Sequence, residues 1–370
     1  MYDIAIVGGG LSGLISSILL SRNGFSVVLL EKNEYPFHRV CGEYISNEVI
    51  PFLEEHDLYP SAFSPAKIDK LTISSTKGSS FHTDLDLGGF GISRFTYDEW
   101  LASMAKNSGV ELYEQTMVSS IEQRETFWRI STSSKDVFES KVVISAHGKR
   151  SKIDQKLNRP FLQKHSPYVG VKYHVKTDYP SDTISLHNFK GGYCGFSKIE
   201  KDLYNICYLT HRDQLKEAGS LASFESNVLL KNPHLMSLWE NSEFVFNKPE
   251  VINEISFKPK ALIHEGILMV GDAAGMITPL AGNGMAMAIR SAAILSNVIR
   301  DNHTNNSFDL QKIYSDYENH WNSYFKKRLW KGRQIQRLFF GSSASSSVAV
   351  ITGKLFSNIT RSIIRQTHGE

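Results

Sequence analysis

Uninterrupted apolar runs followed by glycines mark two distant parts of the chain. Residues 4–7 and 267–270 contain no polar side chain, as is typical of parallel strands covered on both faces. The first run leads into a predicted helix over residues 11–24, which ends on Asn-Gly, and then into a second apolar strand over 25–30. The second run leads into an Ala-, Met- and Ile-rich helix over about 284–300. Both stretches predict strand–turn–helix units of an α/β fold.

Between these units the apolar and polar side chains alternate, which predicts strands with one buried face. Gly, Pro and Asp turns separate these strands, so we expect an antiparallel sheet. Residues 212–245 have a helical and polar pattern. The predicted strands cover residues 71–75, 81–87, 171–175, 183–187 and 203–208.

The first turn has the spacing G-x-G-x-x-G, formed by Gly8, Gly10 and Gly13. In such a turn the first glycine permits the bend, the second lets backbone approach a pyrophosphate, and the third lets the helix pack on the strand. The helix start, with Leu11 and Ser12, adds free N–H groups and the positive end of a dipole. This turn predicts a dinucleotide site; a glycine-rich turn that binds nothing is the alternative.

An acidic residue closes the second strand. Glu31 lies 18 residues after Gly13, where a carboxylate can accept hydrogen bonds from the adenosine ribose of a dinucleotide. Its charge would repel a 2′-phosphate, which argues against NADP in this position. Lys32 follows directly and belongs to the predicted cofactor site.

The second turn suits the other end of the same molecule. Asp272, after Gly271, can bond a ribityl hydroxyl, a group that FAD has and NAD lacks. Pro279 stops the chain, and the next helix start would direct backbone N–H groups at the N1–C2=O side of the isoalloxazine. The residues that lead into this helix are Gly282, Asn283, Gly284 and Met285. Together the two turns predict bound FAD; a small-residue core helix is the alternative for the second turn alone.

The chain resembles the FAD-dependent oxidoreductases of the geranylgeranyl reductase and aromatic-hydroxylase superfamily, which share the glutathione-reductase type of FAD-binding fold. Residues 36–46, Pro-Phe-His-Arg-Val-Cys-Gly-Glu-Tyr-Ile-Ser, are similar to the Pro-x-x-Arg/Lys-x-Cys-Gly segment of the geranylgeranyl reductase-like branch. Residues 94–101, Arg-Phe-Thr-Tyr-Asp-Glu-Trp-Leu, resemble its Arg-x-x-x-Asp-x-x-Leu helix start. The resemblance covers about residues 1–155 and 255–300.

This resemblance implies that Cys41 and Gly42 lie beside the flavin ring. The thiol of Cys41 would shape the pocket or donate a proton to a substrate carbanion, and a small buried side chain is the alternative. Arg39 and Arg94 would bond phosphate or ribityl groups of FAD, or serve as ordinary surface bases. Tyr193 would reach the substrate pocket, although strand tyrosines usually pack in a core. Cys41 and Tyr193 are therefore the catalytic candidates.

Two segments depart from the family pattern. His147 stands where members often carry Asp before Gly in a third motif, so the turn is kept and a carboxylate is lost. Residues 192–197, Gly-Tyr-Cys-Gly-Phe-Ser, lack the Trp and Pro of the aromatic stretch that covers the substrate in reductases. We expect a diverged substrate pocket and a structural role for His147.

These patterns predict an α/β fold with a Rossmann-like FAD-binding domain, built on a parallel sheet of the GR2 type. A substrate domain on an antiparallel sheet and C-terminal helices complete it. The expected division is a discontinuous FAD-binding domain over 1–70, 95–155 and 255–305, a substrate domain over 71–94 and 156–254, and a C-terminal helical basic region over 306–370.

Composition bounds the setting of the protein. Cys41, Cys194 and Cys207 are too few and too irregular for a disulfide framework or a metal site, so no metal is expected. The first strand begins at residue 3, and no run of eighteen apolar residues occurs. We therefore expect no signal peptide, no membrane span and a cytoplasmic location. No second glycine motif sits between a strand and a helix, so NAD(P)H would dock transiently as electron donor without its own domain, or another reductase would supply electrons.

The end of the chain is basic. Residues 310–370 contain ten Lys and Arg and three Asp and Glu, a net charge of +7 that leaves −4 for residues 1–309. Such an amphipathic region either covers the substrate domain with its bases solvated or lies on the inner face of an anionic membrane. We favour the first, because apolar helix faces usually pack within the fold. No nucleic-acid partner is expected, since no recognisable reading module is present.

The predicted function is that of an FAD-dependent oxidoreductase, which passes flavin hydride to a C=C bond of a lipid-like or polyketide-like secondary metabolite. The substrate would be a hydrophobic or aromatic small molecule. A flavin monooxygenase (hydroxylase) is the alternative. A halogenase is less favoured, because the five tryptophans form no Trp-x-Trp pair. A non-catalytic carrier with the same fold is the alternative of another class.

Overall fold

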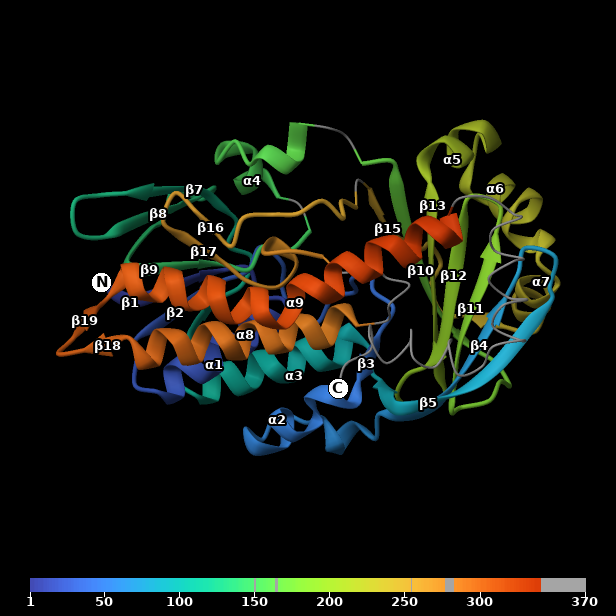
Figure 1. The fold of residues 1–370 in the computed structure, drawn as a ribbon, viewed down its shortest axis with the longest axis horizontal. Helices are drawn as coiled ribbons and strands as arrows, with labels where there is room; N and C mark the ends of the chain where they lie inside the picture. The colour runs from blue at the N-terminus through green and yellow to red at the C-terminus, as the bar shows by residue number, and fades with distance from the viewer. Residues whose placement is uncertain (150, 164–165, 254, 277–282, 341–370) are drawn as a thin grey trace.

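The computed structural model describes residues 1–149, 151–163, 166–253, 255–276 and 283–340. Two sheets lie next to each other along the long axis of the molecule (Figure 1). Helices cover the first sheet on one side, and a separate group of short helices lies on the outer side of the second sheet (Figure 1). This arrangement is the predicted α/β fold.

The first sheet is parallel from its second strand to its last, in the order β16-β17-β9-β1-β2-β6. Strand β16 pairs with β17 in the antiparallel direction. Strands β7 and β8 form a hairpin, and β8 also pairs with β9 in the antiparallel direction. The predicted strands at both glycine turns are confirmed. The strands are β1 (Tyr2–Val7), β2 (Val27–Leu30), β6 (Glu111–Tyr113), β7 (Val118–Gln123), β8 (Trp128–Thr132), β9 (Val137–Ser145), β16 (Ile263–His264) and β17 (Ile267–Met269).

Helices α1 (Leu11–Arg22), α3 (Arg94–Asn107) and α8 (Gly284–Asp301) pack together on this sheet. Every residue of α1 from Leu11 to Leu20 is buried, because one side of the helix faces the sheet and its other sides face α3 and α8. A helix enclosed in this way carries apolar or small side chains all round.

The second sheet has the order β14-β10-β13-β12-β11-β4-β5-β3, with β15 also paired to β10. All its pairs are antiparallel except β11 with β4, which run parallel. The strands are β3 (Tyr44–Ser46), β4 (Ala66–Ser74), β5 (Ser80–Gly91), β10 (Tyr168–Lys176), β11 (Thr183–Phe189), β12 (Gly192–Lys198), β13 (Leu203–His211), β14 (Glu243–Phe244) and β15 (Glu250–Asn253).

Sheet membership and the division drawn from the sequence differ at one place. Residues 44–46 and 66–70 belong to the second sheet, although they fall within the first predicted FAD-binding segment. The hydrophobic alternation of this part is short and interrupted, so the sequence pattern did not show that the chain crosses to the second sheet here. The domain boundaries stay a prediction.

Short helices and one small hairpin complete the described fold. They include the predicted helical stretch after β13, which is confirmed. These elements are α2 (Ile50–Glu55), α4 (Lys152–Lys156), α5 (Arg212–Ala218), α6 (Leu221–Asn227), α7 (Pro233–Glu240), the 3-10 turns 47–49, 61–63, 160–163, 229–231 and 271–273, and the β18 (His303–Thr304)–β19 (Ser307–Phe308) hairpin.

The long helix α9 (Leu310–Phe340) lies along α8 (Figure 1). Its buried side chains follow a strict four-residue spacing and join the core of the first sheet. This stripe therefore packs on the side of the first sheet, which differs from the expectation that the C-terminal region covers the substrate domain. The rest of the basic region, residues 341–370, lies outside the described residues. Over residues 310–334 of α9, where burial is described, the buried side chains are Ile313, Tyr317, Trp321, Phe325 and Leu329.

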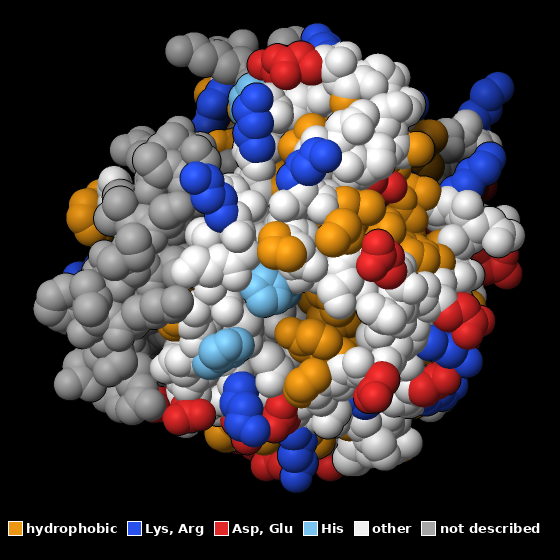
Figure 2. Space-filling model, turned by 90° about the vertical axis from the view of Figure 1, so that its right-hand side faces the viewer, with side chains coloured by type: hydrophobic (Ala, Val, Ile, Leu, Met, Phe, Trp, Pro, Cys, Tyr) orange, Lys and Arg blue, Asp and Glu red, His pale blue; other side chains and the backbone are white. Residues whose placement is uncertain are grey.

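Figure 2 shows the end of the molecule that carries the second sheet. Hydrophobic side chains gather near the middle of this face, and charged side chains lie mostly around them. Met236, Val245 and Val251 are exposed large hydrophobic side chains of the second-sheet part. Exposed apolar side chains are common on protein surfaces, so these three identify no site by themselves. Among the helices that the structure describes, none is long and apolar enough to cross a membrane.

Candidate active site

One cavity of about 890 Å³ is lined by both glycine turns and by the second sheet. Gly13 and Gly271 are not among its lining residues, but both shape the turns. Pro279 and Gly282 lie outside the described residues. The predicted site residues that line the cavity are Gly8, Gly10, Leu11, Ser12, Glu31, Lys32, Arg39, Cys41, Gly42, Arg94, Tyr193, Asp272, Asn283, Gly284 and Met285.

The first turn has the shape that a pyrophosphate requires. Gly8 has a φ of +106°, and a Cβ on Gly13 would lie 2.0 Å from the carbonyl oxygen of Gly8. These two glycines therefore allow the bend and the close approach of α1. A Cβ on Gly10 would have Arg94 Nη2 at 3.7 Å as its nearest neighbour, an ordinary contact, and Gly10 lines the cavity. The turn thus fits the phosphate groups of a dinucleotide.

The two turns are in direct contact. Gly271 has a φ of +64°, and a Cβ there would lie 2.3 Å from Ser12 Oγ in the first turn of α1. The amide of Gly271 donates to Ser291 Oγ on α8 at 3.3 Å. The first residues of α1 and of α8 line the same cavity, as binding of one molecule by both turns requires.

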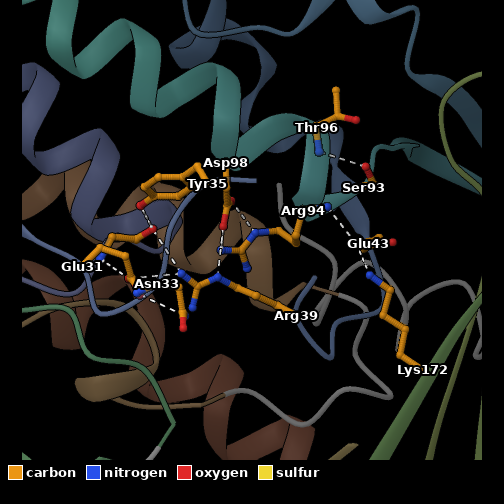
Figure 3. Close-up of polar contacts among 11 residues, drawn as sticks. Glu31, Asn33, Tyr35, Arg39, Glu43, Ser93, Arg94, Thr96, Asp98 and Lys172 are labelled. Atoms are coloured by element: carbon orange, nitrogen blue, oxygen red, sulfur yellow. Dashed lines mark hydrogen bonds and ion pairs between the residues drawn. The ribbon is translucent and has the colours of Figure 1, made fainter. Parts of the chain in front are cut away.

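Glu31 is held at the edge of the first turn. It is 3% exposed, and its Oε2 accepts from the Gly9 amide at 2.8 Å. Its Oε1 accepts from the backbone and side-chain nitrogens of Asn33 at 3.0 and 3.1 Å (Figure 3). These bonds fix the carboxylate on the cavity wall, where the sequence places the ribose of FAD.

Arg39 and Arg94 converge on one carboxylate (Figure 3). Arg94 Nε and Nη2 donate to the two oxygens of Asp98 at 2.6 and 2.7 Å, and Arg39 Nε donates to Asp98 Oδ2 at 3.1 Å. Asp98 is 1% exposed. Burial lowers the pKa of Arg94, but the Asp98 charge outweighs it and the pKa is raised. Arg94 is a fixed cation of the cavity wall rather than an ordinary surface base.

A buried charge cluster follows the Cys41–Gly42 step, and sequence reasoning missed it. Glu43 has a φ of +54°, and its carboxylate contacts Lys172 Nζ at 2.5 Å and His174 Nε2 at 2.6 Å. It also accepts from the Arg94 amide at 2.8 Å. Burial raises the pKa of Glu43, but Lys172 and His174 outweigh it and lower this pKa to about 2. Glu43 is therefore ionised near neutral pH.

A signal for this cluster existed in the sequence. Lys172 and His174 alternate with Val171, Tyr173 and Val175 along a buried strand, so both must point to the same face of the sheet. Charged groups on a buried strand need partners. The partner, Glu43, comes from a segment far away along the chain and could not be identified.

His38 lies against the same cluster and lines the cavity. Its ring stacks on Phe95 with centroids 4.6 Å apart and also contacts Phe246 and His174. Burial, and then the charges of Lys172 and His174, lower the pKa of His38 to about 4. The imidazole is neutral near pH 7.

The part of the cavity beneath the second sheet is mostly apolar, and both catalytic candidates border it. Asn205 Nδ2 donates to the Cys41 carbonyl at 3.1 Å, so strand β13 holds the Cys41–Gly42 step in place. Burial raises the pKa of Tyr193 well above its usual value and, with Cys41, that of Cys207 to about 12, so both groups stay protonated. The apolar lining residues are Leu71, Leu85, Ile184, Leu186, Leu209, Ile252, Ile255 and Met276.

His147 also lines the cavity and has two partners. Its Nδ1 lies 2.6 Å from Ser145 Oγ, and its Nε2 lies 2.8 Å from Asp154 Oδ1. Asp154 also pairs with the buried Arg159 at 3.0 Å. A carboxylate seven residues farther on therefore anchors the histidine at this turn, which agrees with a structural role for His147.

Comparison with known proteins agrees with this geometry. The family model for the FAD binding domain matches residues 1–302, and the chain belongs to this family. It is therefore an FAD-dependent oxidoreductase.

Three proteins illustrate the range of sequences and structures to which this chain is similar. The digeranylgeranylglycerophospholipid reductase of Methanocaldococcus jannaschii is 26% identical over 87% of this chain and 82% of its own length. The structure of a geranylgeranyl bacteriochlorophyll reductase-like protein from Thermoplasma acidophilum superposes with a TM-score of 0.78 at 19% identity, covering 94% of this chain and 90% of that one. The flavin-dependent halogenase CmlS gives a TM-score of 0.77 at 20% identity, covering 89% of this chain but 63% of its own. The two structures show the shared fold.

Proposed function

We propose that this protein reduces a C=C bond of a hydrophobic, lipid-like or polyketide-like metabolite with hydride from FAD. The observation that carries the proposal is the continuous cavity, which leads from the two FAD-binding turns to an apolar surface of the second sheet. The similarity to a digeranylgeranylglycerophospholipid reductase supports this choice of chemistry. The diverged stretch over residues 192–197 argues that the substrate itself differs.

The residues of the chain divide the work between binding and proton supply. FAD, when bound and reduced, supplies the hydride. The apolar side chains around Leu186 and Leu209 bind the substrate and exclude water. Cys41 Sγ would give the proton to the second carbon of the double bond and regain one from solvent, so that one hydride and one proton are added. NAD(P)H is the proposed electron donor.

Hydroxylation or halogenation by the same fold is the second candidate. Solved halogenases share this architecture, and the apolar cavity would also suit an aromatic or polyketide substrate. The two candidates differ in how the reduced protein meets oxygen. An oxygen-reactive enzyme releases peroxide in air when no substrate is present, whereas a reductase keeps its electrons until an alkene arrives.

The decisive experiment is anaerobic reduction of the purified holoprotein by NADH or NADPH, followed by flavin absorbance. We expect bleaching that persists until a prenylated lipid or polyketide alkene is added. Rapid reoxidation by air with release of peroxide and an oxygenated product would instead favour the monooxygenase. A colourless protein that gains no FAD would favour a non-catalytic carrier.

Replacement of Cys41 tests its role. Cys41→Ser should keep the flavin content and lower the turnover of the reduced protein with alkene. Cys194→Ala is the matched control, because Cys194 is buried in the sheet and does not line the cavity. Loss of folding in Cys41→Ser would show that the thiol serves packing only.

Contact with a membrane surface stays a prediction. The described part of α9 turns its apolar stripe to α8 and leaves Lys326, Lys327 and Trp330 exposed. Sedimentation with anionic vesicles of phosphatidylglycerol, compared between the wild type and Lys326→Glu/Lys327→Glu, tests it.

A further inference from the structure

The long helix α9 reaches the start of α8 through one buried carboxylate. Arg328 Nη1 on α9 contacts Glu48 Oε2 at 2.8 Å and Oε1 at 3.1 Å. Glu48 Oε1 also accepts from Asn283 Nδ2 at 2.8 Å. Asn283 precedes the first residue of α8 and lines the cavity with Gly284 and Met285. The chain of contacts therefore runs from α9 to the second cofactor turn.

Burial makes this contact chain energetically important. The side chain of Glu48 is 1% exposed and that of Arg328 is 13% exposed. An ionised carboxylate without a partner in such a place is strongly unfavourable. Arg328 is the ion-pair partner that the structure gives Glu48 among the described residues.

Further contacts hold the arginine in one position. The guanidinium of Arg328 lies 4.9 Å from the centroid of the Tyr324 ring, and that of Arg290 lies 5.4 Å from it. Arg290 Nη2 donates to the backbone carbonyl of Glu48 at 3.0 Å. One aromatic ring thus orders two cations beside Glu48, one from α9 and one from α8.

We propose that α9 contributes to the FAD site and that Arg328 is a positioning residue for this site. Through Glu48, Arg328 fixes the side chain of Asn283 at the cavity wall. It also neutralises a carboxylate that would otherwise oppose the addition of electrons to a flavin bound in the cavity. The first effect concerns FAD affinity, and the second concerns the reduction potential of the flavin.

The test measures FAD affinity and flavin potential in the full chain. Arg328→Met should raise the Kd for FAD by about tenfold or more, because removal of one member of a buried ion pair leaves the other uncompensated. The same variant should have a lower midpoint potential. Arg328→Lys, which keeps the charge, should restore the potential in large part.

Two further variants separate electrostatics from folding. Lys327→Met changes a neighbouring exposed base of α9 and should leave both readouts unchanged. Glu48→Gln in the Arg328→Met background removes the uncompensated charge and should return the potential toward that of the wild type.

Two outcomes would overturn the proposal. In the first, Arg328→Met binds FAD with the affinity and potential of Lys327→Met. In the second, the flavin potential stays low in the Glu48→Gln/Arg328→Met double variant. That result would mean that Arg328 contributes only to packing. If Arg328→Met does not fold, Arg328→Lys and Glu48→Gln alone still report the potential. Neither readout depends on whether the enzyme reduces or hydroxylates its substrate.

Discussion

At the scale of single residues, the candidate site depends on buried charges that are each tied to a partner. Glu43 is fully buried, as is Lys172, and Asp98 holds two arginines. Replacing a buried pair by apolar side chains often costs little, so such pairs are weak evidence for stability. Their position beside the Cys41–Gly42 step makes a role in shaping the cavity the better explanation, since perturbed ionisable groups concentrate at functional sites.

Removal of Lys172 should destabilise the protein strongly. Lys172→Met leaves the buried Glu43 carboxylate without its cation, and we expect a loss of about 3–5 kcal/mol in the free energy of unfolding. The matched control is Lys176→Met on the same strand, whose partner Asp202 is exposed, and its loss should be much smaller because solvent screens that pair. Urea unfolding measures both. Equal small losses would show that the cluster contributes little.

The same carboxylate predicts a dependence on pH. The pKa of Glu43 is lowered from 4.5 to about 2 on folding, so its contribution to stability is complete above about pH 4.5 and disappears as the pH falls toward 2. The Glu43→Gln/Lys172→Met double variant lacks this group. The stability of the wild type relative to this variant should therefore decrease as the pH falls from about 5 toward 2. A constant difference over this range would contradict the lowered pKa.

Glu31 allows a direct test of cofactor binding. Because its carboxylate fixes the Gly9 amide and faces the cavity, Glu31→Ala should purify with markedly less FAD. Flavin absorbance per protein measures the occupancy. Glu34→Ala, a nearby exposed change, is the control, and unchanged occupancy in Glu31→Ala would refute the assignment.

At the scale of elements, the two strand–turn–helix units were predictable because their signals are local. The apolar runs, the glycine spacing and the helix ends all lie within about thirty residues of one another. The contacts that complete the site are not local. Lys172 and Arg328 lie 129 and 280 residues away from the glutamates that they contact, and no pattern in one sequence identifies such partners. The fold was therefore readable, and the charged part of the site was not.

Two glycines of one turn should respond differently to alanine. Gly13→Ala places a Cβ 2.0 Å from the Gly8 carbonyl oxygen, so the helix must shift and both stability and FAD binding should fall. Gly10→Ala meets ordinary contacts only, so the protein should fold with nearly wild-type stability. Its affinity for FAD should nevertheless fall, because the added methyl group occupies the space where the backbone approaches the phosphates. Thermal unfolding together with FAD titration separates the two. Equal effects of both changes on unfolding would contradict this assignment of roles.

At the scale of the whole molecule, the cavity lies between the two sheets, and each sheet contributes a different part of its lining. The first sheet supplies the helix starts, and the second supplies the apolar lining. Gly195 on β12 lies in that lining, and its added Cβ would meet only Cys207 O at 3.5 Å and Leu186 Cδ2 at 3.7 Å. Larger side chains here would extend into the cavity, where we propose that the substrate binds.

Gly195→Leu should therefore keep the bound FAD and its reduction by NAD(P)H, while the reduced protein loses turnover with bulky substrates. Anaerobic reoxidation by alkenes of increasing size measures this effect. Gly195→Ala is the milder control. Loss of FAD in Gly195→Leu would place the flavin, rather than the substrate, beneath this strand.

The way in which the chain passes between the sheets has a mechanical consequence. It crosses from one to the other after β2, after β5, after β9 and after β15. Four covalent crossings restrict how far the two halves can move apart, so we expect only a small relative movement when ligands bind. Ligands should therefore enter the cavity without a large domain movement. X-ray scattering profiles of the FAD-free and FAD-bound protein should nearly coincide.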